Sequence, residues 1–248
     1  MVHPILRFAD FTPKISLTAF IFLVTACAQA TPTATYEPIR VQYSFATQPW
    51  LANLKKCAGN EIVESELRAA DYQETQTIDL VIRIGQSDSL TNTGYQIGTD
   101  DLMIIVNPQN PVRKFTAEQV RQIFTGQILE WQGITGTNSP IQVWVFPAGE
   151  DVQQIFEKSI LGGSPVTSLA RLANSPEEMI RAVSKDANAI GLLTHRWNSE
   201  ETTEVFTVAS GLPGRRRDGM EIQMMPIDPT RKIIVSIIGP HFCVQVMI

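Results

Sequence analysis

Two hydroxyl side chains, Ser44 and Thr47, precede the first predicted helix, which is expected to begin near Pro49. The first backbone N–H groups of a helix have no partner within the helix, and the helix dipole favours negative charge there. Hydroxyls at this point are therefore suited to binding an anion. The alternative is local, with Thr47 capping the helix and Ser44 lying in a turn. The residue types leave both interpretations open.

A second loop carries two carboxylates at a comparable position. Gly149, Glu150 and Asp151 come directly before a helix predicted over 152–160. At an exposed helix N-terminus each acid would contribute about 0.3–1 kcal/mol by complementing the dipole. In a poorly solvated cleft the same carboxylates would repel a phosphate and would favour a cationic or hydroxylated solute. Both roles remain open at this point.

A single arginine interrupts a strongly apolar strand. Arg83 stands in the run LVIRI, and the loop that follows contains Ser87. A guanidinium on a buried strand needs a partner, so Arg83 could hold an anion by paired N–H groups. It could instead pair with an acid, or lie on the solvated side of an edge strand. We count Arg83 and Ser87 among the candidate ligand residues.

Residue types that support catalysis or metal binding are sparse. His195 and His241 have no cysteine or carboxylate neighbours at zinc-like spacing, and His195 is expected in a surface loop. The chain carries neither a Gly-x-Ser-x-Gly motif nor a His-Glu-x-x-His motif. We therefore expect no catalytic residue, no metal site and no cofactor. A disulfide between Cys57 and Cys243 cannot be predicted without geometry.

The N-terminus has the pattern of a lipoprotein export signal. Basic residues precede an apolar run over 15–24, and Val-Thr-Ala then leads to Cys27. Ten apolar residues at 1.5 Å per residue are too few to cross a hydrocarbon core of about 30 Å. We predict a signal peptide over 1–26, lipidation of Cys27 and a polar tether over 27–38. The alternative is an ordinary signal peptide in which Cys27 is incidental.

The composition fits a chain with a sizeable core. Of the 248 residues, 44% are hydrophobic, which argues against a disordered chain. The 20 basic and 25 acidic residues give a formal net charge of −5. A chain of this charge has no general attraction to nucleic acid, so a nucleic-acid partner is not expected.

Apolar periodicity predicts elements that would position these groups. Strands are expected over 39–45, 78–84, 102–106, 141–145, 189–193 and 233–238, the last as the final strand. Besides the helices near Pro49 and over 152–160, one is expected after Thr116, with Gln119 completing a capping box. Another follows Ser175, with Pro176 at its first position. The alternation of strands and helices predicts an α/β fold with largely parallel sheets.

Several short motifs follow one another in order between residues 105 and 193. They comprise Asn107-Pro108, the Thr116 helix, an Ile-Phe-Thr-Gly run that ends at Gly126, Trp131 and the strand AIGLL. In this order they resemble the phosphate-type solute-binding proteins of ABC importers. The likeness covers about 41–208 and is strong from 100 to 193. Trp131 and Phe124 themselves are expected to fill the core.

The resemblance implies a type 2 periplasmic-binding-protein fold, which is α/β with two lobes, mixed sheets and two inter-lobe crossings. By analogy, 36–104 with 203–248 would form lobe one, and 105–202 would form lobe two. The family usually has an arginine and then Gly-Ser-Gly-Thr in its anion loop. In this sequence Phe146 falls near the motif position of that arginine, and Glu150 and Asp151 occupy the positions of the small residues. Phosphate held in the family's usual way is therefore disfavoured.

The function implied is that of a lipid-anchored, extracytoplasmic solute-binding protein. Its partners would be a small solute, with an oxyanion as one class, and an ABC permease. We expect it to be a monomer that touches the membrane only through its lipid anchor and performs no chemistry. The alternative is a degenerate binding-protein domain that serves as a sensor or interaction module.

Overall fold

The computed structural model describes residues 37–58, 62–67, 78–85, 95–207, 220–226, 232–238 and 241–247, with the side chains of 57–58 and 220–247 left aside. All of these residues except Glu37 belong to one compact unit, Pro38–Ile248. The predicted signal peptide, Cys27 and most of the tether lie outside the described residues, as does Ser87. The side chains of Cys57 and Cys243 are likewise outside the description.

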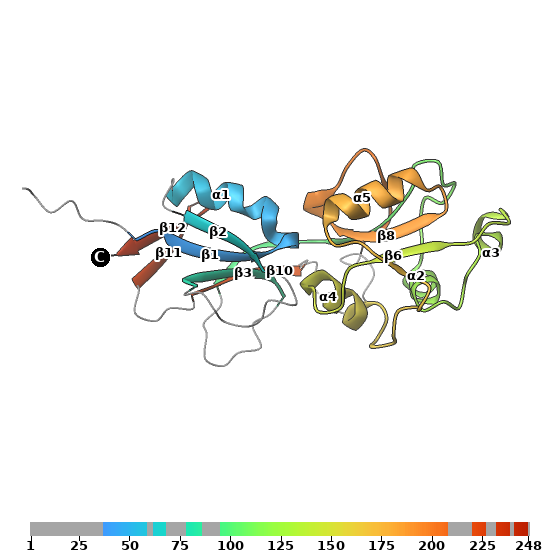
Figure 1. Cartoon of the computed structure of the whole chain (residues 1–248), viewed down its shortest axis with the longest axis horizontal. Coiled ribbons are helices and arrows are strands. Elements are labelled where there is room, and N and C mark those ends of the chain that lie inside the picture. Colours follow the sequence, from blue (N-terminus) through green and yellow to red (C-terminus); the bar gives the residue numbers. More distant parts are fainter. Residues whose placement is uncertain are drawn as a thin grey trace, which may run out of the picture. The chain divides into compact units, whose positions relative to one another are not determined.

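The first sheet contains five strands in the order β2-β1-β3-β10-β4. Strands β1, β2, β3 and β10 are labelled in Figure 1. Their bounds are Ile39–Ser44 for β1, Ile62–Leu67 for β2, Leu80–Ile84 for β3, Tyr95–Asp100 for β4 and Met220–Pro226 for β10. Strand β1 is parallel to both β2 and β3. Strand β10 arrives from the far end of the chain and is antiparallel to both β3 and β4.

The second sheet also contains five strands, in the order β7-β6-β8-β5-β9. Their bounds are Leu102–Val106 for β5, Gln142–Val145 for β6, Arg171–Leu172 for β7, Ala189–Thr194 for β8 and Thr203–Thr207 for β9. Strand β6 is parallel to β7 and β8, whereas β5 is antiparallel to β8 and β9. The predicted α/β fold with mixed sheets is confirmed.

The chain passes between the two sheets twice. It leaves the first sheet after β4, goes through Asp101 and enters the second sheet at β5. It returns between β9 and β10, through residues outside the description. A separate antiparallel pair follows, formed by β11 (Lys232–Ile238) and β12 (His241–Met247). The prediction that 233–238 is the final strand is therefore wrong, because β12 continues the chain in antiparallel register with it.

Helices α2 and α5 begin at the caps that the sequence predicts, and α4 begins one residue before its predicted start at 152. The longer ones are α1 (Gln48–Ala58), α2 (Ala117–Phe124), α4 (Asp151–Ser159) and α5 (Pro176–Lys185). Short turns are η1 (Phe45–Thr47), α3 (Gln132–Thr135) and η3 (His195–Trp197). The Thr116–Gln119 capping box of α2 is confirmed, and Ser175 caps α5 with Pro176 in the first turn. Strand β1 ends one residue earlier than predicted because Phe45 begins η1.

Two central strands of the second sheet form the most deeply buried part of the core. Every residue of β5 and β8 is buried, as expected of strands covered on both faces. Helix α5 lies so close to β8 that a Cβ at Gly191 would stand 2.5 Å from Met179 Sδ. A larger residue at this position would require the Met179 side chain to shift. Phe124 and Trp131 are 0% and 1% exposed, which confirms their predicted place in the core.

Candidate functional site

Arg83 of β3 and Asp151 of α4 form an ion pair that joins two segments distant in sequence. Arg83 Nε and Nη2 donate to Asp151 Oδ1 at 3.1 and 2.5 Å. The backbone N–H of Ile84 donates to Asp151 Oδ2 at 3.3 Å. The side chain of Asp151 is 4% exposed and that of Arg83 is 26% exposed. Of the partners considered for Arg83, the structure therefore places an acid of the second loop beside it.

The loop before α4 presents Asp151 at the first residue of the helix. Glu150 is the N-cap residue, and its side chain makes no capping hydrogen bond. Gly149 has φ of +98°, a conformation that residues with a Cβ rarely adopt. The loop is tied to itself by Glu150 N donating to Pro147 O at 3.2 Å and by Gln154 Nε2 donating to Gly149 O at 2.9 Å. These bonds hold the loop in the conformation from which Asp151 contacts β3.

Glu150 and Asp151 are both buried, at 5% and 6% exposure. They are therefore not the exposed helix-dipole acids of the local interpretation. Their burial strengthens the repulsion that they would exert on a nearby anion, because solvent screens a buried carboxylate less than an exposed one.

Ser44 and Thr47 lie next to β3, at the end of β1 and in η1. Both are buried. The Thr47 hydroxyl can donate either to Ser44 O at 2.8 Å or to Ile82 O at 3.1 Å. Its oxygen is 3.4 Å from Ser44 Oγ. Thr47 therefore bonds to backbone carbonyls, one of them in β3 directly before Arg83.

Strand β3 brings the two candidate loops together. Within three consecutive residues, Ile82 O receives Thr47 and Ile84 N donates to Asp151, while Arg83 between them forms the ion pair. The loops also touch directly, because the rings of Phe45 and Phe146 lie 4.6 Å apart between centroids. Of the predicted residues, the structure thus groups Ser44, Thr47, Arg83 and the loop of Gly149, Glu150 and Asp151.

Two contacts of the candidate site were not predicted from the sequence. One is the Phe45–Phe146 ring pair, which joins the loop after β1 to the loop before α4. The signal for it was an aromatic residue in each otherwise polar loop. The other is the backbone N–H of Ile84, which no side-chain pattern could have revealed.

A further set of contacts surrounds the first crossing between the sheets. Asp100 Oδ1 accepts from Asp101 N at 2.9 Å and from Arg196 N at 3.3 Å, and burial raises the pKa of Asp100. The Arg196 guanidinium carbon lies 3.8 Å from the ring centroid of Trp50. His195 donates its backbone N–H to Asp101 O at 2.8 Å and has an exposed side chain, as predicted. These contacts connect α1, η3 and the crossing.

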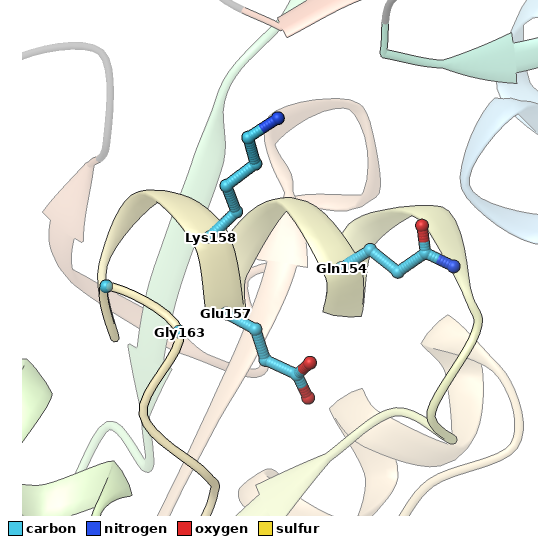
Figure 2. Close-up of a pocket in the computed structure, with 5 residues that line it drawn as sticks. Gln154, Glu157, Lys158 and Gly163 are labelled. Atoms are coloured by element: carbon cyan, nitrogen blue, oxygen red, sulfur yellow. The ribbon is translucent and has the colours of Figure 1, made fainter. Parts of the chain in front are cut away.

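A shallow pocket of 460 Å³ lies beside α4 and the turn that follows it (Figure 2). It is lined by Gln154, Glu157, Lys158, Gly162 and Gly163. None of the predicted ligand residues lines it, so the pocket does not belong to the β3 site.

Among the described residues, no group of three or more His, Cys, Asp or Glu side chains is arranged to hold a metal ion. In the same part of the chain, no helix has the length and apolar character needed to cross a bilayer.

Comparison with known proteins identifies the fold. The PBP superfamily domain matches residues 86–234. A Clostridium perfringens protein with bound phosphate, assigned as a phosphate ABC transporter substrate-binding protein, aligns with TM-score 0.64 and 15% identity over 77% of this chain and 86% of its own.

Two further solved structures share the fold. A Vibrio cholerae ABC-type phosphate transport receptor aligns with TM-score 0.56 and 16% identity over 77% of this chain and 88% of its own. The regulatory domain of Synechocystis CcmR in complex with 2-PG aligns with TM-score 0.53 and 12% identity over 78% and 88% of the two chains. At these identities the likeness is one of fold.

Proposed function

Because this chain belongs to the PBP superfamily, we propose that it is an extracytoplasmic solute-binding protein that delivers a small solute to an ABC permease. In this proposal the lipidated Cys27 attaches the chain to the membrane, the signal peptide over 1–26 is removed and 27–38 is the tether. The protein acts as a monomer, performs no chemistry and binds neither metal nor nucleic acid.

The observation that carries this proposal is the meeting of two loops on β3. Ser44 and Thr47 approach β3 from one loop, and Asp151 approaches it from the other. The site therefore draws on segments far apart in sequence, as a binding site formed by two lobes requires. Gly149, Glu150 and Ser87 complete the proposed ligand residues.

The lobes themselves are part of the proposal. Lobe one comprises 36–104 with 203–248, and lobe two comprises 105–202. Solute capture then proceeds by closure of the lobes around the ligand.

Phosphate is disfavoured as the solute, although the Clostridium perfringens protein was solved with bound phosphate. Glu150 and Asp151 are buried in the loop that would face the anion. Two carboxylates at contact distance oppose a phosphate strongly in a poorly solvated site. A cationic or hydroxylated solute suits these groups better.

Isothermal titration calorimetry on the mature chain tests the proposal. The panel should contain phosphate, sulfate, small cationic solutes and sugar-like solutes. We expect saturable binding of a cationic or hydroxylated solute and no binding of phosphate at micromolar concentration. Submicromolar phosphate binding at neutral pH would refute the interpretation of Glu150 and Asp151.

A second candidate function is that of a sensor or interaction module built on the same fold. The ion pair of Arg83 with Asp151 supports it, because an internal partner already engages the cationic group that would hold an anion. The likeness to a regulatory domain in complex with 2-PG is compatible with this role. If no solute of the calorimetry panel binds, this function is favoured over solute delivery.

A further inference from the structure

We propose that the Asp151 carboxylate occupies an anion site within the protein. By occupying it, Asp151 prevents oxyanions from binding there. The site consists of three donors on β3, namely Arg83 Nε, Arg83 Nη2 and the Ile84 backbone N–H, which we call the β3 donor set. The inference rests on the proposed function and adds to it the reason for excluding oxyanions.

The geometry of the β3 donor set is that of an oxyanion-binding group. A guanidinium presents its N–H groups in a rigid fork that suits carboxylates and phosphates, and a backbone amide adds a directional donor. Here the fork meets Asp151 Oδ1, and the amide meets Asp151 Oδ2. Both oxygens of one carboxylate are thus held by donors of a single strand. A bound tetrahedral oxyanion would offer its oxygens to the same three N–H groups.

Burial separates this pair from ordinary surface pairing. The Asp151 side chain is 4% exposed, so its charge is balanced by the β3 donor set rather than by bulk water. The Asp151 side chain also extends from the first residue of α4, which the Gly149 turn sets in place. The carboxylate is therefore held at the donors by backbone geometry as well as by charge.

An external anion must compete with a group that belongs to the same chain. Even through a flexible connection, an intramolecular group acts at an effective concentration of about millimolar. A fixed carboxylate with three hydrogen bonds competes more strongly than that. Micromolar phosphate or sulfate cannot displace it, and Glu150 in the same loop adds further repulsion. Removing the Asp151 charge should therefore turn the β3 donor set into an open oxyanion site.

The chain contains a matched control for this idea. On α2, Arg121 Nε and Nη2 donate to Glu118 Oε2 and Oε1 at 2.9 and 2.6 Å, which is also a two-point arginine–carboxylate contact. The Glu118 and Arg121 side chains are 54% and 35% exposed. Neutralising Glu118 frees an arginine of the same chemistry at a solvated place, where no oxyanion site should arise.

The experiment measures inorganic phosphate and sulfate binding by equilibrium dialysis to the wild-type chain and to Asp151→Asn, Asp151→Ser and Glu118→Gln. We expect both Asp151 variants to bind oxyanion roughly tenfold or more tightly than the wild type, because the internal competitor is gone. Glu118→Gln should match the wild type. Adding Arg83→Gln to Asp151→Asn should abolish the gain.

Thermal melting in phosphate gives a second measurement. The midpoint of Asp151→Asn should rise with phosphate concentration, whereas that of the wild type should not. If Asp151→Asn does not fold in plain buffer, refolding by phosphate but not by chloride of equal ionic strength supports the inference. Equal failure in both salts contradicts it.

The remaining outcomes separate this inference from the proposed function. A wild-type chain that binds phosphate as tightly as the Asp151 variants overturns the inference, as does an equal gain in Glu118→Gln. A wild-type chain that binds a cationic or hydroxylated solute, with no oxyanion gain in the variants, preserves the function alone. A wild-type chain that binds no solute, together with a clear gain of oxyanion affinity in the Asp151 variants, preserves the inference and contradicts the solute-delivery role.

Discussion

The starts of α2 and α4 use similar residue types for opposite purposes. At α2, the Thr116 hydroxyl accepts from Gln119 N at 3.2 Å, and Gln119 Oε1 accepts from Thr116 N at 2.9 Å. These polar groups satisfy the helix's own first amides. At α4, the Glu150 side chain makes no capping bond, and Asp151 reaches across to β3 instead. At α4 the contact of Asp151 with β3, and not a local cap, accounts for an acid at the first position of the helix.

Loss of the long-range contact at α4 should have the largest effect on stability. Asp151→Ala leaves the Arg83 guanidinium without its carboxylate, and breaking a buried pair in this way costs about 3–5 kcal/mol. Since Arg83 is 26% exposed, water will solvate part of the freed charge, and we expect about 3 kcal/mol. Urea denaturation measures the change in the free energy of unfolding. A loss no larger than that from a cap deletion would break the comparison.

A substitution in the turn before Asp151 should have the next largest effect on stability. Gly149→Ala places a Cβ on a backbone with φ of +98°, which costs about 1–2 kcal/mol for an L-residue in the left-handed region. The strain also shifts the start of α4, so part of the Asp151 contact should be lost with it. Denaturation of Gly149→Ala, alone and combined with Asp151→Ala, measures the two losses. Fully additive losses would show that the turn does not position Asp151.

Deletion of the local cap at α2 should have a smaller and self-contained effect. Thr116→Ala removes the acceptor for Gln119 N and should cost about 1 kcal/mol. Because the capping box is confined to one turn, the loss should add to that of Asp151→Ala without coupling. A double-mutant cycle checks this, and a coupling energy well above the error of the cycle would contradict the local assignment.

The exposed arginine–carboxylate pair on α2 should show the smallest effect. Glu118→Gln should leave the thermal midpoint at neutral pH unchanged within error, because exposed pairs are screened by water and salt. The hydrogen bond from Arg121 lowers the pKa of Glu118, so its small contribution is present above the usual glutamate pKa and fades as pH falls through the lowered value. Melting curves from pH 7 to pH 3 should therefore differ from the wild type only weakly. A neutral-pH shift as large as that of Thr116→Ala would contradict this ranking.

Local rules predicted those parts of the fold in which the determining contacts are close in sequence. The Thr116 capping box and the Ser175–Pro176 helix start each depend on residues within one turn, and both were predicted correctly. The fully apolar strand over 102–106 was equally plain, because burial on both faces leaves no polar position. Strands β2, β4, β7, β9, β10 and β12 were not predicted. Strands β4 and β7 have a weak apolar signal, and β4 is held by pairing with β10, far along the chain.

The candidate site was predicted only in its parts. Arg83 and Asp151 were singled out because each is a charged group where an apolar or a small residue was expected, and Ser44 and Thr47 because their hydroxyls precede a predicted helix. That Arg83 meets Asp151, 68 residues away, depends on how β3 and α4 pack. Whether Arg83 binds an external anion or pairs with an acid of the chain depends on a tertiary contact. No local sequence pattern reveals that contact. The Ile84 amide is invisible to any analysis of side-chain types.

The position of β10 has a consequence for the order in which the two sheets can be completed as the chain emerges, N-terminus first, during synthesis or export. All five strands of the second sheet lie within 102–207, so that sheet has its full set of segments as soon as this stretch has emerged. In the first sheet, β10 stands between β3 and β4, and among the described strands it alone pairs with β4. The described pairing of β4 in that sheet therefore cannot form until residues 220–226 have emerged. Since segments that can form a complete unit tend to fold first, the middle of the polypeptide should become protease-resistant before its beginning does.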